Sequence, residues 1–409
     1  MSAAFAEVIM KRCHFALITH CANSNTYPAL PLCAELVNRG HRVTYVTNNH
    51  YARIIAKTGA EAVVFKERPI PRRVEEEMRR LDSPDRDHTW SAAMRVVRVF
   101  SFAQAVEILS QIDDFYQTNA PDVILYDRYH VAGRILASRL GIPAVQISPS
   151  FAYYKDLAVR ENGVCRNSEE VLEWAEELDL FLLTQGVTTS RNYWHIENLN
   201  IHFIPKEFQY HSDYFDDRFC FAGALLDRPF QRVWTDRSDG KPLILISGVS
   251  SLHARKLDLT EYFRMFVDAL SDSRCHCVLS VAGETYLGSL PANFEINQHA
   301  SHLEILPHTD LAISHGGLAT TLEAIYNGVP TFMIPQNVAC GEVAYRVEEL
   351  GLGTQISRKE LSVKNIRNTV ELMLTDSSLV RRVREMQQKF RQSGGAKLAA
   401  DRLEDCLRG

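Results

Sequence analysis

The 409-residue chain has no apolar run that approaches the ~20 residues needed to span a bilayer as a helix, so no membrane span is expected. Its first ten residues do not form a secretory signal, because the apolar stretch is too short and carries an acid, Glu7. The expected location is therefore the cytoplasm.

Disulfide spacing and strong charge of one sign are also missing. The nine cysteines are an odd number without a framework spacing, and reduced thiols are expected. Several of them lie in apolar stretches, where cysteine packs as a small hydrophobe: Cys13, Cys21, Cys33 and Cys277. The net charge is only −5, so neither nucleic acid nor an anionic membrane is expected as a partner.

What the chain does have is a regular alternation of strand and helix signals, which indicates parallel, doubly wound α/β sheets. In the first half, strands are expected at 14–19, 41–47, 62–65, 121–127 and 144–148, and helices at 27–39, 50–58, 91–119, 131–140 and 151–185. Gly, Pro and Asp gather between 221 and 241, and a second alternating series begins at Leu243. We therefore predict two Rossmann-like domains facing across a cleft, residues 1–222 and 242–395, joined by a linker at 223–241.

The stretch from His315 to Ala324 is the most informative part of the chain. It follows a short apolar strand, Leu311–Ser314, and opens into a helix. A strand, a glycine turn and a helix N-terminus make an anion site, because free backbone N–H groups and the helix dipole point at one spot. Glu323, one turn into the helix, can accept hydrogen bonds from a sugar hydroxyl. The pattern predicts a nucleotide diphosphate site.

Four histidines near this stretch invite comparison with a metal site. They stand at 299, 302, 308 and 315, and their spacing fits no helical zinc pair. No metal is expected.

Three stretches together resemble the macrolide-type glycosyltransferases of bacteria, which are relatives of the UDP-glycosyltransferases and have a GT-B fold. The stretches are Pro28–Tyr45, His315–Glu323 with 328–330 and 335–336, and Glu342 with 346–353. The resemblance spans nearly the whole chain and implies that a C-terminal helix, 396–409, packs back on the first domain. It also implies inverting, metal-independent transfer of a sugar from a nucleotide diphosphate to an acceptor in the first domain, with no further cofactor.

The resemblance assigns the donor nucleotide to residues of the second domain. His315 would contact the diphosphate, Glu323 would hold the ribose, and Ser250 would meet the phosphates from the opposite side. An aromatic side chain commonly stacks on the base where this chain has His299, so dTDP and UDP both stay open. The full set is His315, Gly317, Ala319, Thr320, Glu323, Ser250 and His299.

The acceptor side departs from the family pattern. A histidine usually follows the first strand as general base, and Asn23 occupies that position here, whereas its acidic partner survives as Asp127. An amide cannot accept a proton at neutral pH. Three interpretations follow: Asp127 acts directly as base, the acceptor is acidic enough to need little help, or His20 substitutes. The first two are favoured jointly, with Asn23 positioning the acceptor.

The sugar site departs as well. After Pro335-Gln336 the family carries an Asp-Gln pair that binds sugar hydroxyls, and this chain has Ala339 and Cys340. A site that lacks two polar partners suits a sugar that lacks the matching hydroxyls, so we predict a deoxysugar donor.

Aromatic side chains of the first domain allow an apolar site for a small lipophilic natural product. They are Trp90, Phe100, Phe102, Phe151, Tyr153, Tyr154 and Trp194. The alternative function is a non-catalytic auxiliary protein of the same fold that activates a partner transferase, which the losses at Asn23, Ala339 and Cys340 would also fit. A homodimer is compatible with the sequence.

Overall fold

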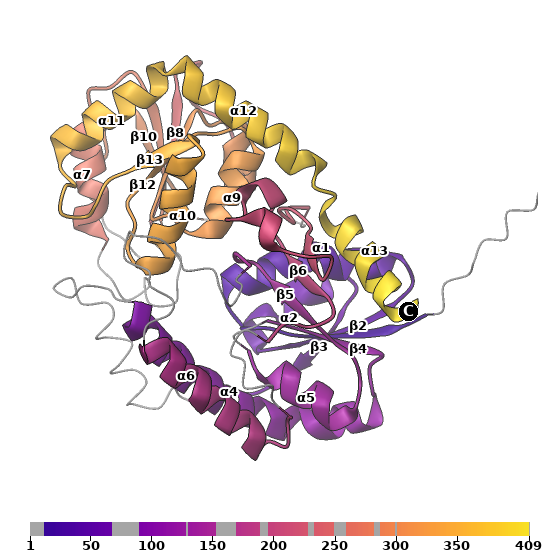
Figure 1. The fold of residues 1–409 in the computed structure, drawn as a ribbon. Helices are drawn as coiled ribbons and strands as arrows, with labels where there is room; N and C mark the ends of the chain where they lie inside the picture. Colours follow the sequence, from indigo (N-terminus) through magenta and orange to yellow (C-terminus); the bar gives the residue numbers. More distant parts are fainter. Residues whose placement is uncertain are drawn as a thin grey trace, which may run out of the picture.

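Two parallel β-sheets, one in each half of the chain, form the framework of the protein (Figure 1). The computed structural model describes residues 12–67, 90–127, 130–152, 169–188, 195–227, 233–248, 259–281, 287–298 and 301–408. Helices cover both sheets, and the predicted α/β architecture is confirmed.

The first sheet has seven strands in the order β3-β2-β1-β4-β5-β6-β7, and neighbouring strands run parallel. All residues of β1 and β4 are buried, as expected for central strands that helices cover on both faces. The strands are β1 His14–Ile18, β2 Arg42–Thr47, β3 Glu61–Val64, β4 Val123–Asp127, β5 Ala144–Ser148, β6 Asn200–His202 and β7 Phe219–Phe221.

The helices of this half begin and end at recognisable signals. The Asn48 side chain accepts hydrogen bonds from the first N–H groups of α2, and Gly141 ends α5 in the left-handed conformation. Helices α4 and α6 lie side by side, with the Phe102 and Phe181 rings stacked 4.5 Å apart (Figure 1). The helices are α1 Asn23–Asn38, α2 Asn49–Ala56, α4 Trp90–Thr118, α5 Ala132–Leu140 and α6 Glu169–Thr184.

The second sheet has six parallel strands in the order β10-β9-β8-β11-β12-β13. Its strands are β8 Leu243–Ser247, β9 His276–Ser280, β10 Phe294–Asn297, β11 Leu311–Ser314, β12 Thr331–Met333 and β13 Gly353–Gln355. Its helices are α7 Thr260–Leu270, α8 His302–Ile305, α9 Leu318–Tyr326, α10 Val338–Glu349, α11 Val363–Thr375 and α12 Ser377–Gln392.

Each sheet has one point where the strand order reverses. In the first sheet the chain runs outward from β1 through β2 to β3, and then resumes at β4 on the other side of β1. In the second sheet the same reversal separates β8 from β11. Ligands of open α/β sheets bind beyond the carboxyl ends of the strands at such reversal points. These two crevices are therefore where a site is expected.

The tail of the chain returns to the first sheet. After α12, helix α13, Gly395–Arg408, packs on the α1 side of that sheet, and Leu403 is fully buried there (Figure 1). Arg39 lies 2.6 Å from Asp401 and 3.3 Å from Glu404. The Nδ1 atom of His41 accepts from the Cys13 backbone, so Nε2 carries the proton and donates to Glu404 at 3.1 Å.

The predicted elements match the observed ones with shifted ends. Helix α1 begins at Asn23, four residues earlier than the expected helix at 27–39, although Pro28 and Pro31 lie inside it. The expected helix from Phe151 to Gln185 is wrong at its start, because Phe151 and Ala152 are irregular and the described helix begins at Glu169. The short strands β6 and β7 were not predicted, since three residues carry too little periodicity.

Two further observations concern membrane spans and disulfides. No helix within the parts described is long and apolar enough to cross a membrane. The eight cysteines that lie in those parts are all free thiols.

The α13 contact generates a stability prediction. Leu403→Ala removes a fully buried side chain from the face against the first sheet, and we expect a loss of about 2–5 kcal/mol of unfolding free energy. Lys397→Ala, at an exposed position of the same helix, should change it by less than about 0.5 kcal/mol. Urea denaturation of both variants checks this, and equal effects would contradict the packing role.

Candidate functional site

The loop between β11 and α9 has the backbone of an anion site. The hydroxyl of Ser314 accepts from the Gly316 N–H at 3.2 Å, and Gly316 has a φ of +84°. Gly317 is the N-cap of α9, and no side chain caps this helix or adds an acid to its first turn. Within the described residues, the first N–H groups of α9 therefore have no side-chain cap, at the positive end of the helix. Ala319 and Thr320 lie in this turn, as predicted.

His315 stands against this loop as a neutral donor or acceptor. Burial lowers its pKa to about 4, and the nearby His302 acts in the same direction while a hydrogen bond with the Gly248 backbone opposes both. A Cβ on Gly317 would lie 2.7 Å from Nε2 of His315, so the glycine makes room for the ring. At neutral pH the imidazole can donate one hydrogen bond to a phosphate oxygen without carrying charge.

Glu323 lies one turn further into α9 and is 4% exposed. Its Oε2 is 3.9 Å from Nδ1 of His302, whose Nε2 lies 2.9 Å from the Ser280 hydroxyl. The carboxylate is thereby placed on the cleft side of the helix with one histidine beside it. The sequence did not single out His302 as a site residue, because its place between β9 and α9 is a tertiary relation.

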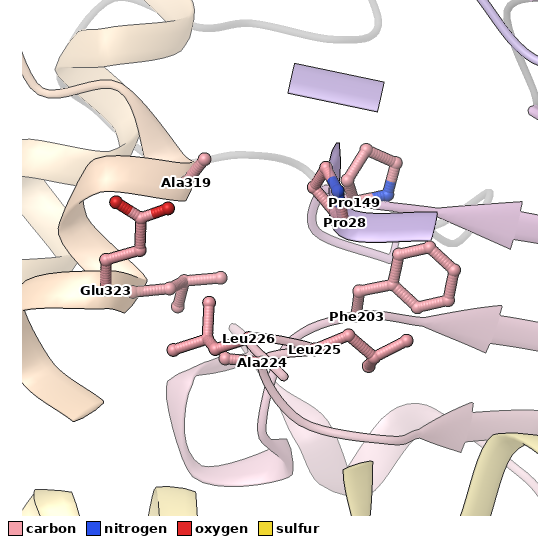
Figure 2. Close-up of a pocket in the computed structure, with 9 residues that line it drawn as sticks. Pro28, Pro149, Phe203, Ala224, Leu225, Leu226, Ala319 and Glu323 are labelled. Atoms are coloured by element: carbon pink, nitrogen blue, oxygen red, sulfur yellow. The ribbon is translucent and has the colours of Figure 1, made fainter. Parts of the chain in front are cut away.

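A pocket between the two halves brings Glu323 opposite the first sheet. Figure 2 shows Ala319 and Glu323 on one side and Pro28, Pro149 and Phe203 on the other. The pocket contains about 330 Å³ of empty space, part of it open to solvent. Its lining is Pro28, Pro149, Phe203, Ala224, Leu225, Leu226, Ala319, Leu322 and Glu323. Every lining residue of the first half and the linker is apolar, so the carboxylate of Glu323 faces an apolar wall.

Asp127, at the end of β4, is held by a residue that the sequence did not single out. It is 2% exposed, and its Oδ2 accepts from the side-chain amide of Asn25 at 2.9 Å. Asn23 instead accepts at its Oδ1 from the Tyr51 hydroxyl at 2.8 Å. Both asparagines lie in the first turn of α1, and their side chains contact different partners.

His20 lies at the same crevice. Ile18 pairs with Tyr126, so the residues after β1 lie beside Asp127. The ring of His20 contacts His130, in the turn after β4, edge to face at 4.9 Å between ring centroids. His130 is 2% exposed, and neither of its ring nitrogens has a hydrogen-bond partner among the described residues. Burial and the proximity of His20 lower its pKa well below the usual value, which keeps it neutral.

The residues expected at the sugar divide between surface and core. Gln336, just before α10, is half-buried. Ala339, in the first turn of α10, is exposed. Cys340 is buried under the glycine loop, where a Cβ on Gly316 would lie 2.9 Å from its carbonyl oxygen. Burial raises the pKa of its thiol to about 11. Cys340 therefore supports the loop, and Ala339 is the solvent-exposed position of the pair.

Some residues predicted for the site fall outside the described part of the chain, and two belong to packed cores. Ser250 and His299 fall outside the described residues, as do Tyr153, Tyr154, Trp194 and the side chains of Trp90 and Phe100. Phe102 stacks on Phe181, and Phe151 is buried against Phe208 in the core of the second half. Those two rings are packing residues, which corrects their assignment to an acceptor pocket. In the described part of the chain, no three His, Cys, Asp or Glu side chains gather as a metal site.

Arg346 joins the two halves beside this cleft. From α10 it donates to the backbone carbonyls of Glu207, Phe208 and Gln209 at 2.9–3.0 Å. Its guanidinium also lies over the ring of Tyr210, whose hydroxyl donates to the Glu342 carbonyl at 2.7 Å. These contacts fix the segment after β6 against α10. The sequence marks Arg346 only as part of the family pattern.

The glycine loop generates a prediction with a matched control. Gly316→Ala combines an unfavourable positive φ with a contact at 2.9 Å to backbone, and we expect it to cost about 1–3 kcal/mol of stability. Gly341→Ala, inside α10 with nothing within 4 Å of the new Cβ, should be neutral or gain up to about 1 kcal/mol. Thermal unfolding distinguishes them, and a neutral Gly316→Ala would show that the loop relaxes freely.

His315 generates a pH prediction. Its pKa is about 4 in the folded chain against a usual 6.5, so the unfolded chain binds more protons between these values. Stability from this group is complete above about pH 6.5 and is lost as pH falls toward 4, by roughly 2 kcal/mol at pH 5. Urea denaturation at pH 8 and pH 5 should show a smaller loss in His315→Gln than in the unmodified protein. Identical losses would mean that His315 titrates normally.

Known proteins resemble the chain over nearly its full length. Residues 267–398 match the family described as erythromycin biosynthesis protein CIII-like, C-terminal domain. The chain is 32% identical over 405 residues to the NDP-glycosyltransferase YjiC of Bacillus subtilis (strain 168), covering 97% of each. It is 28% identical to an oleandomycin glycosyltransferase of Streptomyces antibioticus, covering 96% of this chain and 90% of that protein.

A solved structure agrees with the sequence relatives. The calicheamicin glycosyltransferase CalG4 superposes with a TM-score of 0.79 at 31% identity, covering 97% of this chain and 99% of its own. This similarity extends over both sheets, and it confirms the predicted GT-B fold. The chain belongs to the macrolide-type glycosyltransferases.

Proposed function

We propose that this glycosyltransferase moves a sugar from a dTDP- or UDP-sugar to a small hydrophobic natural-product acceptor, with inversion at the anomeric carbon and without a metal. The observation that carries the proposal is the uncapped N-terminus of α9, which has neutral His315 at its start and buried Glu323 one turn on. That combination supplies donors for a diphosphate and an acceptor for ribose hydroxyls within one helix.

In the proposed reaction, the acceptor oxygen attacks the anomeric carbon of the donor sugar. The bond from that carbon to the diphosphate oxygen breaks, its electron pair leaves with the nucleotide diphosphate, and a base takes the acceptor proton. Negative charge then grows on the diphosphate, where fixed N–H groups stabilise it without having to reorganise. This supports catalysis without a metal or other cofactor. Attack from the side of the first domain, opposite the leaving group, gives inversion.

The acceptor class follows from the opposite wall of the pocket. Its side chains from the first half and the linker are all apolar (Figure 2), which suits a lipophilic molecule. Two of the relatives carry oleandomycin and calicheamicin in their names, which supports a natural-product acceptor. Asp127, Asn23 and His20 are the proposed acceptor-side residues.

The sugar class follows from the missing polar pair. Exposed Ala339 offers a methyl group where the family carries an acid, and the buried thiol of Cys340 does not replace the amide. We propose a deoxysugar, with Gln336 as its remaining polar contact. The domain limits 1–222, 223–241 and 242–395, the cytoplasmic location and a homodimer stay proposals.

Calorimetry with dTDP, UDP and their sugars, both deoxy and fully hydroxylated, tests the donor site. We expect binding of at least one nucleotide sugar, with a deoxysugar preferred. His315→Ala should weaken nucleotide binding by about 10- to 100-fold, because a hydrogen bond to a charged group contributes about 1.5–3 kcal/mol. Product analysis by mass spectrometry with lipophilic acceptors then tests transfer.

A control comes from His308, which lies before β11 at the opposite edge of the same sheet. His308→Ala should leave nucleotide affinity unchanged. If no nucleotide sugar binds, the enzyme proposal is wrong. If a sugar donor binds without transfer to any acceptor, the result favours the non-catalytic auxiliary function.

A further inference from the structure

The acceptor side needs a base, and the residues expected to supply it are engaged elsewhere. Asp127 is 2% exposed, and one of its carboxylate oxygens holds the amide of Asn25. At 2% exposure, this carboxylate offers little access to a hydroxyl of a bound acceptor. Asn23 has no basic atom, and its carbonyl oxygen accepts from Tyr51. This inference rests on the proposed function, because it concerns the proton that the transfer releases.

His20 is partly exposed at the reversal point between β1 and β4, which is the crevice where a ligand of this sheet is expected. The other histidines between β1 and α2 are less suited. His14 is the first residue of β1 and His41 precedes β2, so both lie at the opposite edge, where they are buried and hydrogen-bonded to Thr44 and Glu404. His50 lies at the correct edge but beyond β2, where its ring packs on Tyr51.

His130 lies against His20 and can fix the direction of its ring. A buried imidazole whose two nitrogens have no partner among the described residues is unfavourable for folding alone. Its ring contacts His20 edge to face, and it stays neutral because of burial and the proximity of His20. The edge-to-face contact holds the ring of His20 against the buried ring of His130.

We propose that His20 is the general base of the transfer and that His130 is the buried positioning residue that orients it. A ring nitrogen of His20 takes the acceptor proton while the acceptor oxygen bonds to the anomeric carbon and the nucleotide diphosphate departs with the electron pair of the broken bond. The imidazolium then returns the proton to water. Asp127 orders the neighbouring start of α1 through Asn25.

The test compares two acceptors of different acidity. For an aliphatic alcohol, His20→Gln should lower kcat by about 10²–10⁴-fold, because the alcohol needs a base. For 4-nitrophenol, which ionises near neutral pH, the loss should be less than about threefold. Calorimetry should show unchanged affinity for the nucleotide sugar in the same variant. Added imidazole should partly restore alcohol transfer in His20→Gly.

Two further variants separate chemistry from structure. His130→Phe keeps a buried ring and removes the unpartnered nitrogens, so folding should be retained. We expect kcat for the alcohol to fall by about 10- to 100-fold through misplacement of His20, with 4-nitrophenol transfer unchanged. His50→Ala, at the same edge but outside the crevice, should leave both acceptors within about twofold.

The outcomes are distinct. Equal losses of alcohol and nitrophenol transfer in His20→Gln, or no loss for either, would overturn the assignment of His20 while leaving the proposed function intact. Absence of donor binding and of any transfer by the unmodified protein would contradict the proposed function and this inference together.

Discussion

Parallel strand direction is the constraint on which the rest of the structure depends. Because the paired strands of each sheet run the same way, every loop that follows a strand leaves from one edge. The helix N-termini that follow those loops bring free N–H groups to that edge. The pocket lined by Pro28 from α1 and Glu323 from α9 shows that the two edges face each other. Arg346 maintains this arrangement by donating to three consecutive carbonyls across the junction.

The two sides of the cleft differ in the charges that they bury. On the donor side, a neutral histidine and an uncapped helix offer positive potential without a full charge that would need a buried counter-ion. On the acceptor side, the carboxylate of Asp127 is buried and satisfied by an amide, and the wall nearby is apolar. In the proposed reaction, fixed dipoles stabilise the negative charge that develops on the leaving diphosphate, and the acceptor proton passes to His20.

The junction also shows how rigid the cleft is. Phe151, Ile204 and Phe208 come from the first half of the chain, yet they are buried in the core of the second. The returning helix α13 adds a second connection through Leu403 and the pair of His41 with Glu404. Burial of apolar surface at both connections stabilises one relative placement of the sheets. The positions of Glu323 and the apolar wall follow from that placement.

The sequence by itself determined the sheet type, the location of the glycine loop that we propose binds the diphosphate, and the family, because these are local patterns with fixed spacing. His315, Thr320 and Glu323 were identifiable for this reason. The tertiary structure decided that Asn25 rather than Asn23 contacts Asp127, that Cys340 lies under the loop, and that Phe151 is a core residue. Which partner a side chain reaches depends on helix rotation and on contacts more than a hundred residues apart. Local spacing carries no information about either.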